Sequence, residues 1–253
     1  MDRIKQNREL MKSNFEEIDR LGILSDQEKE LPQPPLQKPF DDSGEIIDLP
    51  QVDASIIRKK DILSCLKDRR SRRKYSDEEL SINELSFLLW ATQGVDKVTK
   101  NNYSTLRPVP SAGARHPFET YLVINRVEGI KSGVYRYLAL SHQLLHMYSD
   151  EQIEEKATAA TLDQPFAGNC AVLFIWSCVP YRGEWRYHMT AHKPMLLDAG
   201  HLCQNLYIAC EAIECGTCAI AAYDQKLMDE LIKVDGEEEF TVYLSPVGKF
   251  NAN

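Results

Sequence analysis

The longest apolar run in the chain, from Ala171 to Trp176, constrains the fold more than any other feature. A membrane-spanning helix needs about 20 apolar residues, so this run is too short to cross a bilayer. Extended to Cys178, the run predicts a strand that is buried on both faces. Other β-rich runs predict strands over residues 120–125, 133–138, 143–148 and 240–244. The second and third of these are close enough in sequence to form a hairpin.

Helical patterns alternate irregularly with the predicted strands. Asp198 is expected to cap a long helix that continues to Ile213. The residues Ser81 and Glu84 have the spacing of a capping box, which predicts the start of another helix. Further helices are expected over residues 56–66, 151–162 and 224–232. This irregular order predicts an α+β fold rather than a doubly wound parallel sheet.

The first 55 residues differ in character from the rest. An amphipathic helix is expected over residues 2–21, followed by an arm that is rich in proline and therefore extended. Apolar residues in the arm suggest that it lies as a strap over a neighbouring surface, such as a homodimer partner. We therefore predict an N-terminal helix and proline-rich arm over 1–55 and one globular domain over 56–253.

The overall charge limits the classes of partner. A formal net charge of -8 argues against a nucleic-acid-binding protein, because such proteins spread positive charge over a whole face. The N-terminal residues lack the apolar core of a signal peptide, and seven cysteines are scattered without a compact disulfide framework. The expectation is a cytoplasmic protein with reduced thiols and no membrane segment.

Arg69, Arg70, Arg72, Arg73 and Lys74 place five cations in six residues, together with the hydroxyl of Ser71. Guanidinium groups match the geometry of phosphate, and a nearby helix end can add backbone N–H donors. A small phosphorylated ligand is one interpretation of this run. A solvated basic turn or a weak nucleic-acid patch is the other.

Small residues lie between prolines in the loop from Pro108 to Pro117, which leaves its backbone accessible. Either a flat ring packs there or the segment is an ordinary tight loop. Cys215 and Cys218 have the spacing of a redox dithiol, but they follow the expected end of a helix, where the dipole does not lower a thiol pKa. His188 and His192 share a helix face without further metal ligands, so no metal is expected.

Four motifs follow one another along the chain. They are Arg69-Arg70-Ser71-x-Arg73-x-Tyr75, Pro110-Ser111-Ala112-Gly113-Ala114-Arg115-His116-Pro117-Phe118-Glu119, Asp198-Ala199-Gly200-His201 and Pro246-Val247-Gly248-Lys249. In this order they resemble the FMN-dependent nitroreductase superfamily, and more closely its SagB-type dehydrogenase subgroup. The resemblance implies a central, mostly antiparallel sheet flanked by helices. It also implies a homodimer with FMN at the interface and residues 198–213 as the central dimer helix.

The same resemblance implies which residues hold FMN. The phosphate would be held by the first motif, with a contribution from the C-terminal end, and the flavin edge would be lined by the proline loop. A segment of small residues at 219–222 would bring backbone N–H groups to the flavin. The implied cofactor-binding residues are Arg69, Arg70, Ser71, Arg73, Pro110, Ser111, Ala112, Gly113, Ile220, Ala221, Ala222 and Lys249.

The implied activity is hydride transfer between NAD(P)H and a small organic acceptor such as a nitroaromatic or a quinone. An alternative is a SagB-type azoline dehydrogenase, or a non-catalytic flavin-fold subunit, of a peptide-modifying system. Azoline oxidases of the subgroup carry a Lys-Tyr pair where this chain has Arg186-Tyr187, and arginine cannot act as a base near neutral pH. Tyr187 is therefore either a catalytic residue or a packed aromatic. Ala114 replaces an asparagine that bonds the flavin in many nitroreductases.

Overall fold

A computed structural model describes residues 2–41 and 44–250 of the chain. Its centre is a seven-stranded sheet with the order β1-β6-β5-β4-β7-β9-β8, in which each neighbouring pair is antiparallel. The strands are β1 (Ile46–Asp48), β4 (Phe118–Ile124), β5 (Gly133–Leu138), β6 (Gln143–Tyr148), β7 (Val172–Cys178), β8 (Cys215–Thr217) and β9 (Phe240–Lys249). A short hairpin of β2 (Lys97–Val98) and β3 (Thr105–Leu106) stands apart from the sheet.

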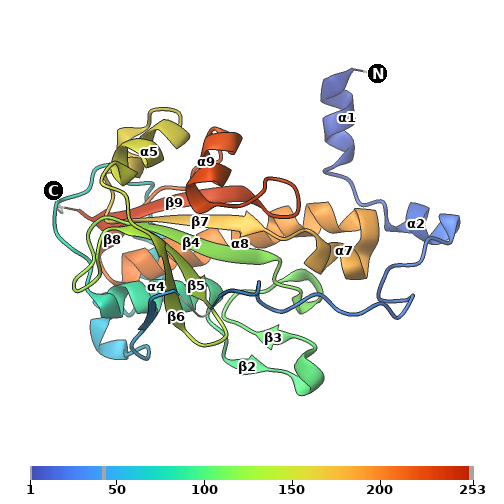
Figure 1. Cartoon of the computed structure of the whole chain (residues 1–253), viewed down its shortest axis with the longest axis horizontal. Helices are drawn as coiled ribbons and strands as arrows, with labels where there is room; N and C mark the ends of the chain where they lie inside the picture. The colour runs from blue at the N-terminus through green and yellow to red at the C-terminus, as the bar shows by residue number, and fades with distance from the viewer. Residues whose placement is uncertain (1, 42–43, 251–253) are drawn as a thin grey trace.

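Helices cover both faces of this sheet (Figure 1). The longer helices are α4 (Ile82–Gln93), α5 (Ile153–Ala160), α8 (His192–Ala212) and α9 (Gln225–Ile232). The shorter ones are α1 (Arg3–Glu9), α2 (Phe15–Leu21), α3 (Ile62–Asp68), α6 (Pro165–Gly168) and α7 (Tyr181–Tyr187). The short 3-10 turns are η1 (Ala54–Ile56), η2 (Lys100–Asn102), η3 (Ala112–Ala114) and η4 (His188–Ala191). The predicted α+β fold is confirmed.

The alternation of side chains along β4 and β7 explains why the sheet has a layer of helices on each of its two faces. Leu122 and Phe174 pack with α4 and α8 in one buried cluster. Their neighbours Val123 and Leu173 pack with α5 and α9 in another. Successive residues of a strand point to opposite faces, so a run that is apolar at every position has both faces covered.

The long helix begins earlier than the sequence predicted. Asp198 was expected to be its N-cap, but α8 starts at His192 and Asp198 lies inside it with 6% exposure. Pro194 is the third residue of α8, a position where the missing N–H would have had no partner within the helix. The proline therefore does not end the helix. The helix ends at Ala212, and Gly216, between the two cysteines of the possible dithiol, lies in β8.

The N-terminal arm departs from the prediction in two ways. The expected single helix over residues 2–21 is two short helices, α1 and α2, which project beside α7 at one end of the molecule (Figure 1). The residues 25–41, which we call the strap, lie over their own chain, as Gln27 N–H donates to Trp185 O at 2.8 Å. β1 then pairs with β6 and joins the main sheet. The domain boundary at residue 55 stays a prediction.

Among the described residues, α8 is the longest helix, and neither it nor any shorter one combines the length and apolarity of a membrane span.

Candidate functional site

The basic run follows α3 in extended backbone, and its side chains fall into two groups with different contacts. Arg72 N–H donates to Thr217 O at 2.9 Å, which holds the run beside β8. The Arg72 side chain pairs with buried Glu211, and Arg70 donates to the carbonyl groups of Lys67 and Arg69. These two arginines therefore have partners within the protein.

Arg69, Ser71 and Arg73 make different contacts. The Arg69 guanidinium lies 5.4 Å from the ring centre of Tyr207, and that of Arg73 lies 5.9 Å from the ring centre of Phe166. No carboxylate forms an ion pair with either arginine among residues 2–41 and 44–250. Two cations without a counter-charge beside an exposed hydroxyl are suited to bind a phosphate.

Tyr207 connects this run to the segment after β8. Its hydroxyl oxygen lies 2.9 Å from Ser71 Oγ and accepts a hydrogen bond from Ala219 N–H at 2.8 Å. Ala221 and Ala222 follow at the surface, and within the described chain their N–H groups donate to no acceptor. Exposed amides flanked by methyl side chains let a flat ring approach the backbone. The segment predicted to hold the phosphate and the segment predicted to contact the ring therefore lie side by side.

The proline loop is held by α8. Buried Asp198 accepts a hydrogen bond from Ser111 Oγ at 2.6 Å and from Ala112 N–H at 3.2 Å. Burial raises the pKa of Asp198, while the bonds from Ser111 and Ala112 and the nearby His201 oppose the rise. Asp198 thus fixes the loop instead of capping a helix.

Gly113 brings the loop against the end of α7. Its φ is +58°, and a Cβ at this position would lie 2.6 Å from the hydroxyl oxygen of Tyr187. Half-buried Tyr187 also contacts Phe15 edge-on, with ring centres 6.3 Å apart, and the Arg186 guanidinium lies 5.4 Å from its ring centre. Arg186 donates to the Tyr103 hydroxyl at 2.7 Å. The residues 186–187 therefore lie against the proline loop.

Within one chain the two parts of the site lie far apart. Asp198 and Tyr207 are separated by nine residues of α8, which is about 14 Å and two and a half turns. The proline loop and the basic run therefore contact opposite sides of this helix, at different heights.

Several other predicted residues have different environments. Lys249 Nζ pairs with Glu84, with 15% and 13% of the two side chains exposed, so its charge is compensated within the protein. All seven cysteines are free, and burial raises the pKa of Cys215 to about 12, which disfavours its thiolate. His192 Nε2 lies 2.8 Å from Glu184.

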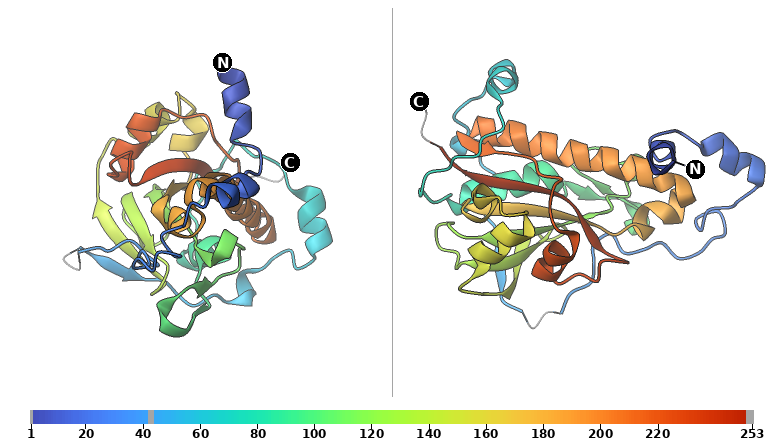
Figure 2. Two further views of the ribbon diagram at one scale, coloured as in Figure 1. Left: turned by 90° about the vertical axis from the view of Figure 1, so that its right-hand side faces the viewer. Right: turned by 90° about the horizontal axis from the view of Figure 1, so that it is seen from above.

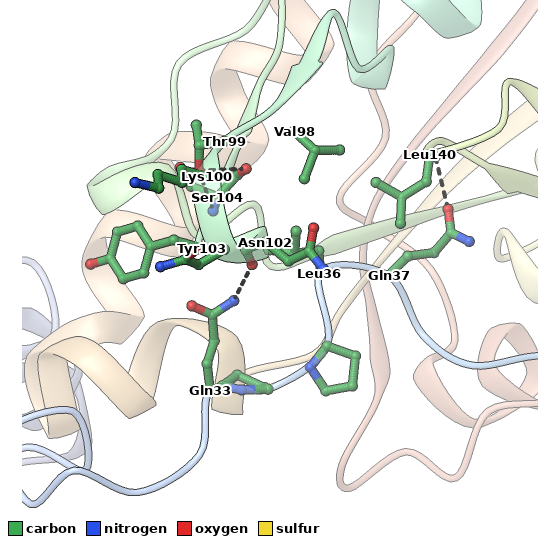
Figure 3. Close-up of a pocket in the computed structure, with 13 residues that line it drawn as sticks. Gln33, Leu36, Gln37, Val98, Thr99, Lys100, Asn102, Tyr103, Ser104 and Leu140 are labelled. Carbon is green, nitrogen blue, oxygen red and sulfur yellow. Dashed lines mark hydrogen bonds between the residues drawn. The ribbon is translucent and has the colours of Figure 1, made fainter.

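A hollow of about 980 Å³ lies between the strap and the tip of the β2–β3 hairpin (Figure 3). Gln33 Nε2 donates to Asn102 O at 3.1 Å across one end, and Leu140 N–H donates to Gln37 Oε1 at 3.0 Å at the other. Its lining includes Tyr103, whose hydroxyl accepts from Arg186, but none of the arginines of the basic run. The hollow is thus a neighbour of the proline loop and not of the phosphate-binding candidates.

Sequence reasoning missed Tyr207 and the true role of Asp198. Both lie on the apolar stripe of a predicted helix, where a tyrosine or an aspartate is an ordinary occurrence. The signal for Asp198 was its place in a motif, and Tyr207 gave none.

Comparison with known proteins identifies the family. The Nitroreductase family matches residues 66–249. MJ1384 of Methanocaldococcus jannaschii, a candidate nitroreductase, is 29% identical over 206 residues, which cover 81% of this chain and 98% of that protein. The trifolitoxin-processing protein TfxB of Rhizobium leguminosarum is 27% identical over 62% of this chain, and the match spans less than half of TfxB, 44%.

Solved structures share the fold. A candidate nitroreductase from Anabaena variabilis has a TM-score of 0.69 at 20% identity, covering 82% of this chain and only 42% of that longer chain. A chain of the Escherichia coli microcin synthetase McbBCD, solved with truncated pro-MccB17 bound, has a TM-score of 0.63 at 17% identity over 98% of this chain and 92% of that one. Members of the family are FMN-dependent. The chain belongs to the Nitroreductase family.

Proposed function

We propose that the chain is a cytoplasmic FMN-dependent oxidoreductase that transfers hydride between NAD(P)H and a small organic acceptor, such as a nitroaromatic or a quinone. The observation that carries this proposal is the pair of uncompensated guanidinium groups of Arg69 and Arg73 beside Ser71, next to the accessible backbone of Ala221 and Ala222. FMN would supply the redox chemistry. The protein would hold its phosphate, offer backbone donors to its ring and leave room for alternating substrates.

We also propose that the active form is a homodimer. The proline loop and the basic run contact opposite sides of α8, so one flavin can meet both only when they come from different chains. Leu196 and Leu197 of α8 are 61% and 57% exposed. Helix α3, which also has exposed apolar side chains, lies on the side of α8 away from the sheet (Figure 2). Such an apolar surface is suited to a second copy.

The phosphate anchor can be tested by substitution. Arg69→Ala and Arg73→Ala should each weaken FMN binding about ten- to a hundredfold, because a hydrogen bond to a charged group contributes about 1.5–3 kcal/mol. Titration of the apoprotein with FMN, followed by fluorescence, measures this change. Exposed Arg58, substituted by Ala, is the matched control, and Arg70→Ala should also leave affinity near the wild-type value. Unchanged affinity in Arg69→Ala and Arg73→Ala would show that the anchor lies elsewhere.

A second candidate function is a flavin subunit of a peptide-modifying system, either an azoline dehydrogenase or a non-catalytic partner. The likeness to TfxB and to the microcin synthetase chain favours it. Against azoline oxidation, Arg186 is bonded to Tyr103 and cannot serve as a base near neutral pH. Turnover with NADH and NADPH against nitroaromatics, quinones and azoline peptides separates the candidates. Bound FMN that neither nucleotide reduces would favour the peptide-modifying subunit.

A further inference from the structure

The strap is bonded directly to α7, the helix that ends in Arg186 and Tyr187. Gln27 N–H donates to Trp185 O at 2.8 Å, and Trp185 Nε1 donates to Leu31 O at 3.0 Å. Tyr181, at the start of α7, donates to Asp26 Oδ2 at 3.0 Å. Both ends of this short helix are therefore tied to the strap.

Lys38 fastens the strap to buried charges of the sheet. Its N–H donates to Glu119 Oε1 at 2.7 Å, its carbonyl accepts from Arg136, and its Nζ pairs with Glu239. Both carboxylate side chains are only 5% exposed. Without Lys38 Nζ, the charge of buried Glu239 would be left with the hydroxyl groups of Tyr121 and Ser177, so the Lys38 side chain stabilises the strap against the sheet.

Glu119 links this fastening to α7, because the same carboxylate pairs with Arg182 of that helix. Burial would raise the pKa of Glu119, but Arg182, Arg136 and the N–H of Lys38 outweigh it and hold the pKa below its usual range. The strap and α7 thus share one ionised group.

The strap also reaches the proline loop through Arg115. This buried guanidinium donates to Gly113 O at 3.1 Å, to Gln33 Oε1 at 3.2 Å and to Tyr103 O at 2.7 Å. Gln33 and Asn102 are the two residues bonded across the end of the hollow in Figure 3. The loop, the hairpin tip and the strap therefore meet at one side chain.

We propose that the strap is an internal brace of the acceptor side of the site, and that Lys38 and Gln33 are positioning residues. They hold α7 and the proline loop so that Tyr187 stays against Gly113, where the gap leaves no room for a methyl group. The flavin phosphate site does not depend on them, because Arg69 and Ser71 contact Tyr207 of α8 and Arg73 contacts Phe166 of α6, outside the strap. The catalytic part of this inference rests on the proposed oxidoreductase function.

The test compares Lys38→Met with Lys226→Met, a lysine of α9 whose ion pair with Glu230 is at the surface and outside the strap. Lys38→Arg should restore the charge, and Gln33→Ala is a milder variant should Lys38→Met fail to fold. Hydrogen–deuterium exchange of the full chain is the first measurement. Lys38→Met should speed exchange at least fivefold in residues 181–187 and 110–116, with unchanged exchange in 69–73 and 219–222. Lys226→Met should change neither region.

Kinetics of the FMN-loaded protein are the second measurement. In Lys38→Met and Gln33→Ala, the KM for the acceptor should rise about five- to tenfold while the Kd for FMN stays within twofold of wild type. If α7 keeps its protection when the strap amides exchange faster, the brace is refuted. Equal loss of protection everywhere would also refute it, since it indicates a general stabilising role. Failure to bind FMN in the wild type would overturn the proposed function and leave the exchange result valid.

Discussion

His116 shows at the residue scale how burial of a titratable group affects stability. It is 6% exposed, and burial, with Arg107 nearby, lowers its pKa to about 3. The unfolded chain therefore binds a proton near pH 6.5, whereas the folded chain does not, so stability falls as the pH drops below that value.

The expected loss of unfolding free energy between pH 7 and pH 5 from this residue is about 2 kcal/mol. Urea unfolding at the two pH values, compared between the wild type and His116→Asn, measures it. Asn is chosen because His116 has a φ of 45°, a left-handed conformation that Asn tolerates. The variant should lose that part of the pH dependence. If the unfolding free energy falls by the same amount between pH 7 and pH 5 in the wild type and in His116→Asn, His116 is protonated in the folded protein.

At the scale of elements, the contact between the proline loop and α7 predicts a specific response to Gly113→Ala. The substitution combines left-handed strain, about 1–2 kcal/mol, with a clash against Tyr187. Gly129→Ala is the matched control, since Gly129 has a φ of +75° but no atom within 4 Å of an added Cβ. Gly113→Ala should lower the urea midpoint more than Gly129→Ala does, and Tyr187→Phe should recover part of the difference. Equal urea midpoints for Gly113→Ala and Gly129→Ala would mean that α7 moves away from the added methyl group without loss of unfolding free energy.

The strands and most helices could be predicted because their signals are local. Short runs of apolar and aromatic residues predicted β5 and β6 with the observed bounds, and the capping box predicted α4. The start of α8 could not be predicted, because a proline in the first turn of a helix looks the same in the sequence as a proline that breaks a helix. The partner of the strap could not either, since it depends on Glu119 and Glu239, far away in sequence. For the same reason, nothing local indicated that Glu84 compensates Lys249.

At the scale of the whole molecule, the candidate site is divided over α8, and this division is the basis of the proposed homodimer. The resemblance supplied the residue types of both parts, but their separation along one helix is a property of the folded chain. Exposed apolar residues of α3 support the proposed interface: Ile62, Leu63 and Leu66 are each more than half exposed. Isolated apolar residues at a surface are common, but α3 adjoins the C-terminal end of α8 and the exposed leucines lie near its N-terminal end, so exposed apolar residues occur at both ends of this helix and indicate an interaction surface along it.

The double substitution Leu196→Lys with Leu197→Lys should convert the proposed dimer to a monomer, because two pairs of charges would have to be desolvated at the interface. Analytical ultracentrifugation measures the mass, and absorbance near 450 nm measures bound flavin. Leu227→Lys on α9, at the opposite face of the sheet, is the control and should remain dimeric. Because each flavin would need the proline loop of one chain and the arginines of the other, monomer formation and flavin loss should occur together. A monomer that keeps FMN at wild-type affinity would show that one chain holds the cofactor alone.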